Sequence, residues 1–404
     1  MFLLEKTFSR RFWDGLDKVR RLRNKCGMVE DIRYPSIMYM KPAARRRIPH
    51  FVWEYLDSAT GNEATKTRNI QALQTISMMP AILSGEIKPT THKTFLGHIY
   101  DLPFGIAPVG LSGAIWPDAE RILARQAARS NIPYTLSTVA CQTPETIGPI
   151  SGDNGWFQLY PPRDPEVRRD MLNRIDKSGF KTLVITVDIP APSRRERQTR
   201  GGITQPPALT FRILAQIACR PRWSLGMAQF GRPEMPFVAS YGNNVRGLPT
   251  TEHLGYLLRI SPDMEYLTWL RDHWDGNLII KGVLNPMDCP KLENIGVDAL
   301  WVSNHAGRQF DAAPATIEIL PTIRKATNLP IVFDGGIEGG LDMIRAVALG
   351  ADFVMMGRAW HYALGALANK GPTHLTKILE QDLIANMSQL GLCDLQNCAA
   401  ALWP

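Results

Sequence analysis

Short runs of apolar, often β-branched residues recur along the chain, and segments with the apolar spacing of a helix lie between them. Eight such runs predict strands, at Gly105–Val109, Tyr134–Ser137, Trp156–Tyr160, Thr182–Asp188, Leu278–Lys281, Ala299–Asn304, Ile331–Asp334 and Phe353–Met356. Helices are predicted between them, as at Asp118–Ser130, Glu166–Lys177, Thr316–Thr327 and Leu341–Leu349. Eight strand-then-helix units are typical of an α/β fold, the closed (β/α)8 TIM barrel. A doubly wound sheet is the competing fold, but no glycine fingerprint follows the first strand.

The spacing between two of the predicted strands is unusually long. The fourth and fifth predicted strands begin at residues 182 and 278, whereas most others begin about 20–30 residues apart. We therefore expect a long insertion after strand 4, at about residues 190–260, on the catalytic face of the barrel. The expected organisation is a basic N-terminal helical extension over residues 1–50 and a barrel over residues 51–404 that carries the insertion.

Positive charge is concentrated in these two segments. The formal net charge is +8, and residues 1–50 hold 13 Lys or Arg against 5 Asp or Glu, which already accounts for it. From Arg194 to Arg232 there are eight arginines, one Glu and no Lys. Two local basic segments favour two contacts with an anionic surface. A nucleic-acid-binding protein would be expected to spread its charge over the fold.

Both basic segments also carry apolar residues, a combination that suits the surface of an anionic membrane. In the N-terminal segment these are Phe8, Phe12, Leu16, Val19 and Leu22, roughly on one helical face, and in the insertion they are Phe211, Ile213, Leu214, Ile217, Trp223 and Leu225. A transit peptide and a helix packed on its own domain are alternatives for the first segment. A self-packed or disordered loop is the alternative for the second.

The apolar runs and the cysteines indicate where in the cell the protein is located. No run of about 18 apolar residues predicts a spanning helix. The six cysteines form no CxxC pair and no metal-ligand spacing, which favours a reducing compartment and gives no metal site. We expect a cytoplasmic protein, free or peripheral on the inner face of the membrane.

Polar side chains stand at the ends of seven of the eight predicted strands. They are Ser137, Gln158 with Tyr160, Thr186 with Asp188, Lys281, Asn304 with His305, Asp334, and Gly357 with Arg358. Because the carboxyl ends of barrel strands meet at one face, we expect these side chains to share one mouth, where such enzymes carry their chemistry.

Two stretches at this face carry the most information. In Asp334–Gly340 a strand runs into a glycine-rich turn, and Gly357-Arg358 closes the next strand, which is a pattern typical of a phosphate site. In Ser303–Asp311, His305 precedes Arg308 by three residues. A histidine can take a proton from a hydroxyl group, and an arginine can hold a carboxylate.

Taken together, these residues resemble the FMN-dependent 2-hydroxy acid dehydrogenase and oxidase family, which includes glycolate oxidase, flavin L-lactate dehydrogenase and mandelate dehydrogenase. The resemblance spans about residues 50–400. It runs through Trp156–Tyr160, Thr186–Asp188, Lys281-Gly282, Ser303–Asp311 and Asp334–Gly336. The insertion, with Arg194-Arg195, is most similar to that of the bacterial membrane-associated L-lactate dehydrogenases.

The resemblance implies an FMN cofactor and the oxidation of a small L-2-hydroxy acid, lactate-like or larger, to the 2-oxo acid. It implies four catalytic residues: His305 as the base, Asp188 holding it, Tyr160 near the substrate oxygen and Lys281 beside flavin N1–O2. The implied substrate-binding residues are Tyr55, Arg195, Arg308, Tyr160 and Val139. The implied cofactor-binding residues are Ala107, Pro108, Val109, Ser137, Gln158, Thr186, Lys281, Ser303, Asp334, Gly335, Gly336, Gly357 and Arg358.

Three positions depart from the family pattern. Ala306 stands where the family usually has glycine after the base. Glu338 stands where the family commonly has an arginine on the FMN phosphate, and a carboxylate there opposes a dianion. Val139 stands where the short-chain oxidases carry a bulky aromatic residue, which indicates a larger or different substrate pocket.

The basic segments favour an oxidoreductase that passes electrons to a membrane quinone or another carrier. A peroxide-forming oxidase is the alternative within enzymes, and a flavin-binding, membrane-docking module without activity is the alternative outside them. The resemblance further implies a homotetramer.

Overall fold

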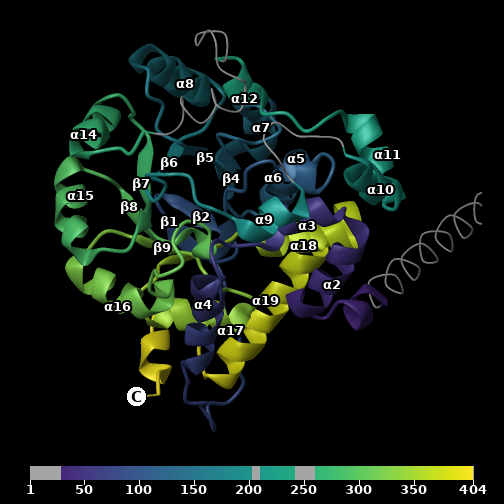
Figure 1. Cartoon of the computed structure of the whole chain (residues 1–404). Coiled ribbons are helices and arrows are strands. Elements are labelled where there is room, and N and C mark those ends of the chain that lie inside the picture. The colour runs from purple at the N-terminus through teal and green to yellow at the C-terminus, as the bar shows by residue number, and fades with distance from the viewer. Residues whose placement is uncertain (1–28, 203–209, 242–259, 404) are drawn as a thin grey trace, which may run out of the picture.

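Eight parallel strands form a closed barrel at the centre of the molecule. The computed structural model describes residues 29–202, 210–241 and 260–403, and helices surround the strands (Figure 1). The barrel closes in the order β10-β3-β4-β5-β6-β7-β8-β9. Its strands are β3 (Phe104–Ile106), β4 (Tyr134–Ser137), β5 (Gly155–Leu159), β6 (Thr182–Thr186), β7 (Asn277–Val283), β8 (Ala299–Val302), β9 (Ile331–Phe333) and β10 (Phe353–Met356). The expected TIM barrel is confirmed.

Several strands end earlier than the sequence predicted. The first ends at Ile106 and not at Val109, and the sixth in the barrel ends at Val302 and not at Asn304. The backbone explains the second difference, because Asn304 has φ −111° and ψ 27° and His305 has φ +55°, neither of which is extended. The polar residues expected as strand ends therefore lie partly in the loops that follow.

The helices around the barrel follow the predicted periodicity. The four named predictions correspond to α6 (Ala119–Arg129), α8 (Pro165–Lys177), α16 (Thr316–Ala326) and α17 (Gly340–Ala348). The other helices of the barrel and the C-terminal segment are α5 (Ser112–Ile115), α7 (Pro144–Ser151), α14 (Met264–Asp272), α15 (Cys289–Ile295), α18 (Arg358–Leu367) and α19 (Gly371–Gln389).

The barrel interior is divided into an apolar lower layer and a polar upper layer. A hairpin of β1 (Lys93–Phe95) and β2 (His98–Tyr100), which the sequence analysis did not predict, contributes Phe95 and Tyr100 to the buried apolar cluster. Strand periodicity then places a polar side chain two residues beyond an apolar one on the same face. The pairs are Trp156 and Gln158, Val184 and Thr186, Ile279 and Lys281, Trp301 and Ser303, and Val332 and Asp334. The polar layer lies toward the carboxyl ends of the strands.

Among the described residues, α2 (Ile37–Arg47), α3 (His50–Asp57) and α4 (Ala64–Thr75) precede the barrel. α2 belongs to the expected extension, yet it packs closely on α18, where a Cβ added to Gly365 would lie 2.7 Å from Ala44 Cβ. Arg47 Nη1 also donates to the carbonyl of Ala366. The predicted amphipathic face from Phe8 to Leu22 lies outside the described residues.

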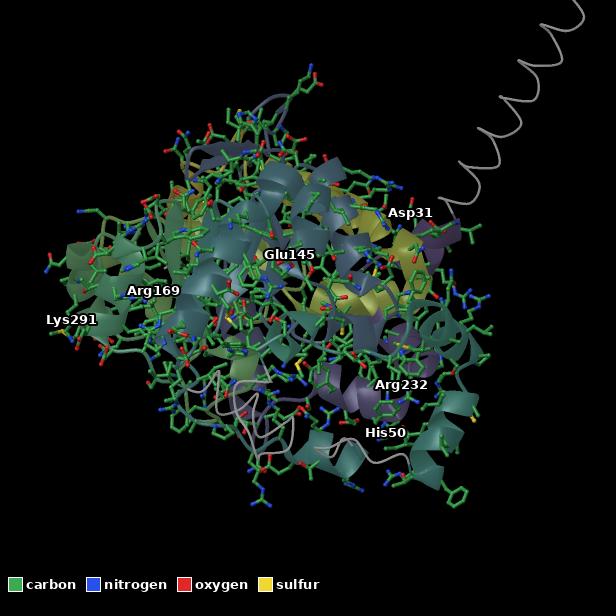
Figure 2. All side chains as sticks on the ribbon, turned by 90° about the horizontal axis from the view of Figure 1, so that it is seen from above. Asp31, His50, Glu145, Arg169, Arg232 and Lys291 are labelled. Carbon is green, nitrogen blue, oxygen red and sulfur yellow. The ribbon has the colours of Figure 1, made fainter. Side chains whose placement is uncertain are left out.

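The insertion after β6 contains α9 (Glu196–Gly201), α10 (Phe211–Ala218), α11 (Pro221–Phe230) and α12 (Pro236–Ala239). α10 and α11 project at the edge of the molecule near α3 (Figure 1). Gln216 Oε1 accepts from Phe51 N at 2.9 Å, and Arg220 Nε donates to Ile48 O at 3.1 Å. Seen from above, Arg232, just after α11, and Lys291 of α15 stand at opposite sides of the molecule (Figure 2). No helix among the described residues is long and apolar enough to cross a membrane.

Candidate active site

A cavity of about 420 Å3 opens at the carboxyl ends of the barrel strands, within the usual size range of small-molecule sites. Most of the expected site residues line it: Tyr55, Ala107, Pro108, Val109, Val139, Tyr160, Arg195, Lys281, His305, Arg308, Asp334, Gly335, Gly336, Gly357 and Arg358. The others, Ser137, Gln158, Thr186, Ser303 and Asp188, are not in its lining. The first four are buried in the barrel, and Asp188 contacts His305.

His305 and Asp188 form a hydrogen-bonded pair at the cavity wall. His305 Nδ1 lies 3.1 Å from Asp188 Oδ1, and the two side chains are 21% and 13% exposed. Burial lowers the pKa of His305 below its usual 6.5, although Asp188 partly opposes this. Burial alone would raise the pKa of Asp188, but His305 holds it below its usual value. The pair therefore combines a neutral imidazole with a carboxylate near neutral pH.

The backbone around the histidine is unusual. His305, Ala306 and Gly307 have φ values of +55°, +54° and +74°. Gly307 also has no room for a side chain, because an added Cβ would lie 2.6 Å from Lys66 N in α4. The turn thus needs glycine at position 307, whereas Ala306 adopts the left-handed region at some cost in energy.

Three arginines face the same cavity. Arg308 Nη1 donates to Tyr55 O at 3.0 Å, in the last turn of α3. It also donates to Ser58 O at 2.7 Å, just after this helix. Burial, together with Arg195 and Arg358, lowers the pKa of Arg308 to about 9. Mutual repulsion of this kind is relieved by an anion, so the arrangement favours an anionic ligand.

Two tyrosines complete this wall. Tyr55 donates its hydroxyl proton to Gly110 O at 2.8 Å. Burial raises the pKa values of both Tyr55 and Tyr160, which keeps their hydroxyl groups protonated as donors. Val139 packs close by, since a Cβ on Gly110 would lie 2.6 Å from its Cγ2.

An ammonium group, a hydroxyl and a carboxylate are joined in the polar layer beneath. Lys281 Nζ donates to Ser303 Oγ at 2.7 Å and lies 3.1 Å from Asp334 Oδ2. Ser303 Oγ donates to Asp334 Oδ1 at 2.7 Å, and Trp301 Nε1 donates to Asp334 Oδ2 at 2.9 Å. Lys281 is only 4% exposed, so this pairing keeps a buried charge compensated.

The neighbouring strands contribute a second polar pair. Ser137 and Gln158 are register partners on β4 and β5, and Ser137 Oγ donates to Gln158 Oε1 at 3.0 Å. Gln158 Nε2 is buried and has no hydrogen-bond partner within the described part of the chain. A buried amide group without an acceptor is costly, so this group fits the oxygen or nitrogen edge of a ligand.

The glycine-rich turn forms the end of the cavity nearest α4. Gly335 and Gly336 have φ +119° and +87°, and an added Cβ on Gly336 would lie 2.7 Å from Asn69 O. Arg358 lines the same cavity and donates to Ser58 O at 3.1 Å. Glu338 lines the cavity and is exposed to solvent on one side. Partial desolvation raises the pKa of its carboxyl group, and Asp342 and Asp57 add to this effect. Lys41 acts in the opposite direction and lowers that pKa.

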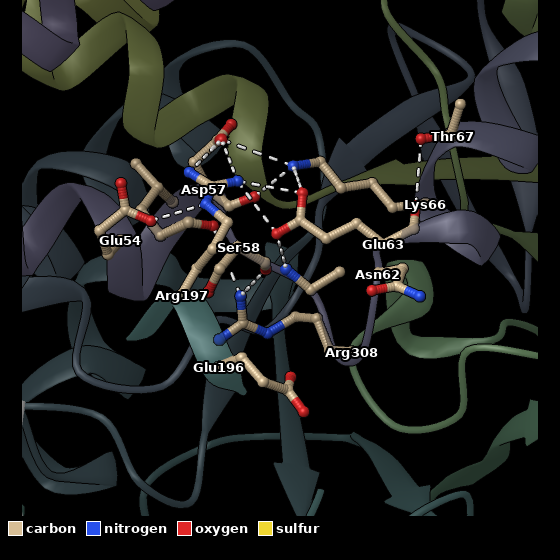
Figure 3. A network of polar contacts seen from close by, with 12 residues as sticks. Glu54, Asp57, Ser58, Asn62, Glu63, Lys66, Thr67, Glu196, Arg197 and Arg308 are labelled. Carbon is tan, nitrogen blue, oxygen red and sulfur yellow. Dashed lines mark hydrogen bonds and ion pairs between the residues drawn. The ribbon is translucent and has the colours of Figure 1, made fainter. Parts of the chain in front are cut away.

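Several residues of the cavity were not predicted from the sequence. The N-terminal helices contribute Lys41 and Lys66, and the insertion contributes Gln198 and Met235. Lys41 contacts Asp57. Lys66 and Arg197 of α9 contact the same carboxylate (Figure 3). Lys41 and Lys66 lie far before the first barrel strand. The sequence carries no signal that their helices, α2 and α4, cover the mouth.

Comparison with known proteins agrees with this geometry. The family model for FMN-dependent dehydrogenase matches residues 44–403. The L-lactate dehydrogenase of Pectobacterium atrosepticum is 37% identical over 359 residues, which cover 87% of this chain and 92% of that protein. Among solved structures, the monotopic membrane protein (S)-mandelate dehydrogenase has a TM-score of 0.86 and 29% identity, covering 91% of this chain and 98% of that one. A mandelate oxidase variant has a TM-score of 0.74 and 27% identity, covering 90% and 97%.

These matches cover the barrel and all the strand ends that surround the cavity. The expected FMN cofactor and the expected oxidoreductase class are confirmed by the family model. The chain belongs to the FMN-dependent dehydrogenase family.

Proposed function

We propose that this FMN-dependent 2-hydroxy acid oxidoreductase oxidises a small L-2-hydroxy acid, lactate-like or larger, to the 2-oxo acid. One observation carries the proposal. The His305–Asp188 pair faces the same cavity as three arginines and two tyrosines, so a base and a carboxylate site stand together. L-lactate dehydrogenases at 37% identity support the substrate class.

His305 is the base that takes the proton from the substrate hydroxyl. Its Nδ1 faces Asp188, which accepts that hydrogen bond and leaves Nε2 to accept the proton. As the imidazolium forms, the Asp188 carboxylate stabilises it. Tyr160 donates to the substrate oxygen, and its raised pKa keeps the proton available.

Arg308 and Arg195 bind the substrate carboxylate, and Tyr55 is a further donor once its hydroxyl proton turns from Gly110 O to the acid. A guanidinium group presents paired N–H donors that match a carboxylate. Arg308 is already oriented by the carbonyl groups of Tyr55 and Ser58, so little freedom is lost when an acid binds. Val139 at the wall leaves room for a side chain larger than a methyl group.

The residues of the barrel mouth fit FMN. Bound there, FMN supplies a two-electron acceptor at N5. Gln158, with its unpartnered Nε2, Ser137 and Thr186 would hold the isoalloxazine edge, together with the backbone of Ala107, Pro108 and Val109. Lys281, oriented by Ser303, would stabilise negative charge near N1–O2, and Asp334 would accept from the ribityl hydroxyls. Gly335, Gly336, Gly357 and Arg358 would hold the phosphate.

A membrane quinone or another carrier is the proposed electron acceptor, and the insertion is the proposed contact with the membrane. Phe211 is 93% exposed and Leu225 is 70% exposed, and both lie among arginines on α10 and α11. The (S)-mandelate dehydrogenase of similar structure is a monotopic membrane protein. We also propose a homotetramer, on the family resemblance alone.

The decisive experiment is anaerobic mixing of the purified flavoprotein with L- and D-2-hydroxy acids while the flavin absorbance is followed. We expect L-lactate or a larger L-acid to bleach the band. His305→Gln is expected to slow bleaching about 10²–10⁴-fold with flavin still bound, because the proton has no acceptor. If none of the acids bleaches the wild-type flavin, the proposed reaction is wrong.

A peroxide-forming oxidase is the second candidate, because a mandelate oxidase is among the similar structures. Turnover in air with a dye or a quinone analogue present separates the two. Stoichiometric peroxide at a rate equal to dye reduction would exclude the dehydrogenase reading.

A further inference from the structure

The phosphate end of the cavity has a charge that a cofactor phosphate would not favour. Glu338 occupies the position where the family commonly has arginine, and it lines the cavity with Gly335, Gly336 and Arg358. A carboxylate beside a phosphate dianion is repulsive. Of the residues expected to hold the phosphate, Arg358 is the one cation, so a second cation at this end would offset the charge of Glu338.

Lys41 of α2 is such a cation. It lines the same cavity, and of the charges that act on Glu338 it is the strongest positive one. Its Nζ lies 3.1 Å from Asp57 Oδ1, and its side chain is 35% exposed. Asp57 is held in turn by Tyr362, whose hydroxyl donates to Asp57 Oδ1 at 2.7 Å. Lys41 is thus anchored at one side and open to the cavity at the other.

The second lysine at this end, Lys66, is less available. Its Nζ contacts Asp57 O at 2.6 Å, Asp57 Oδ2 at 3.4 Å and Glu63 Oε2 at 3.0 Å, as Figure 3 shows. An ammonium group has three N–H donors, so Lys66 uses all of them within the protein. Among the described residues, Lys41 Nζ contacts one carboxylate oxygen, which leaves two donors for a ligand.

We propose that Lys41 binds the FMN phosphate, together with Arg358 and the Gly335–Gly336 turn, in place of the arginine that Glu338 replaces. Asp57 acts as a positioning residue that holds Lys41, with Lys66 adding positive potential. This inference rests on the FMN site proposed above. It also makes α2, which the sequence assigned to an extension outside the barrel, a part of the cofactor site.

The test compares FMN with riboflavin, which lacks the phosphate. Apoprotein is titrated with each flavin, and quenching of flavin fluorescence gives the dissociation constants. We expect Lys41→Met to weaken FMN binding about 10–100-fold, the loss typical of a hydrogen bond to a charged group, and to leave riboflavin binding unchanged. Lys41→Arg should retain most of the preference for FMN. Lys325→Met, at an exposed position on α16, is the matched control and should bind both flavins like the wild type.

A second variant keeps the test informative if Lys41→Met folds poorly. Glu338→Gln removes the opposing charge and should tighten FMN binding without affecting riboflavin. The proposal is overturned if Lys41→Met weakens both flavins equally or neither, or if Glu338→Gln leaves FMN binding unchanged. A wild-type protein that binds neither flavin would instead contradict the proposed cofactor site.

Discussion

Asp188 stabilises the imidazolium form of His305, which has two consequences that a pH profile can detect. It raises the pKa of His305 in the resting protein, and it favours the transfer of the substrate proton to the imidazole. Because burial keeps that pKa below 6.5, the base is neutral above it. Activity should therefore be present at neutral pH and be lost as the pH falls through the lowered pKa.

Asp188→Asn should shift this acid limb to still lower pH, because the group that raises the pKa of His305 is removed. At the same time the plateau of kcat/KM should fall about 10²–10⁴-fold, since the imidazolium loses its partner. Profiles of kcat/KM from pH 4.5 to 9 measure both effects. A limb that moves to higher pH would show that Asp188 does not act on His305 as the structure indicates.

Ala306 has a backbone conformation that is unfavourable for a residue with a side chain. Its φ of +54° is costly for alanine by roughly 1–2 kcal/mol, while glycine adopts it freely but has more entropy to lose on folding. We expect Ala306→Gly to raise the free energy of unfolding by about 0.5–1 kcal/mol in denaturant titrations. Gly307→Ala is the contrasting variant and should be destabilising, because its Cβ would lie 2.6 Å from Lys66 N. Equal stability of the two variants would contradict this account.

At the scale of elements, α10 and α11 differ from the helices that cover the barrel. Barrel helices bury their apolar faces, whereas Phe211, Leu214, Leu225 and Phe230 are exposed here beside arginines. The N–H of Phe51 and the carbonyl of Ile48 bind this helix pair to the body, so it stands in a fixed place with its apolar side chains outward. Such a surface is typical of a contact site.

We expect Phe211→Ser with Leu225→Ser to reduce co-sedimentation with anionic phospholipid vesicles by at least tenfold, since each buried apolar side chain contributes roughly 1.5–3 kcal/mol. Dye-linked turnover in solution should stay unchanged. Ile82→Ser, at an apolar residue 82% exposed elsewhere, is the matched control and should bind vesicles like the wild type. Equal loss in the control, or none in the double variant, would count against the membrane contact.

At the scale of the whole molecule, the N-terminal helices and the barrel behave as one packed unit. Replacing glycine by alanine inside a helix normally stabilises it by roughly 1 kcal/mol. In α18, however, a Cβ on Gly365 would lie 2.7 Å from Ala44 Cβ of α2. We therefore expect Gly365→Ala to destabilise the protein by about 1–3 kcal/mol, as overpacking does. Thermal unfolding with and without FMN checks this, and a more stable variant would show that α2 is not held tightly on α18.

Much of the candidate site could be predicted because it follows local rules. Strand periodicity and the common carboxyl face placed Gln158, Lys281 and Asp334 together, although they are up to 176 residues apart. The pairing of His305 with Asp188 came from the family resemblance, and the structure brings the two side chains to 3.1 Å. The β1–β2 hairpin was not predicted, because two three-residue strands leave almost no periodic signal.

The sequence by itself determined the eight strands, the helices between them and the polar residues at the ends of seven strands, because periods of 2 and 3.6 residues are visible in the local sequence. Only the tertiary structure decided what closes the mouth. Lys41 and Lys66 meet at Asp57, and Gly307 packs on the backbone of Lys66, through contacts that join remote segments by shape and charge. No periodicity records such contacts, since each depends on how two packed elements approach one another.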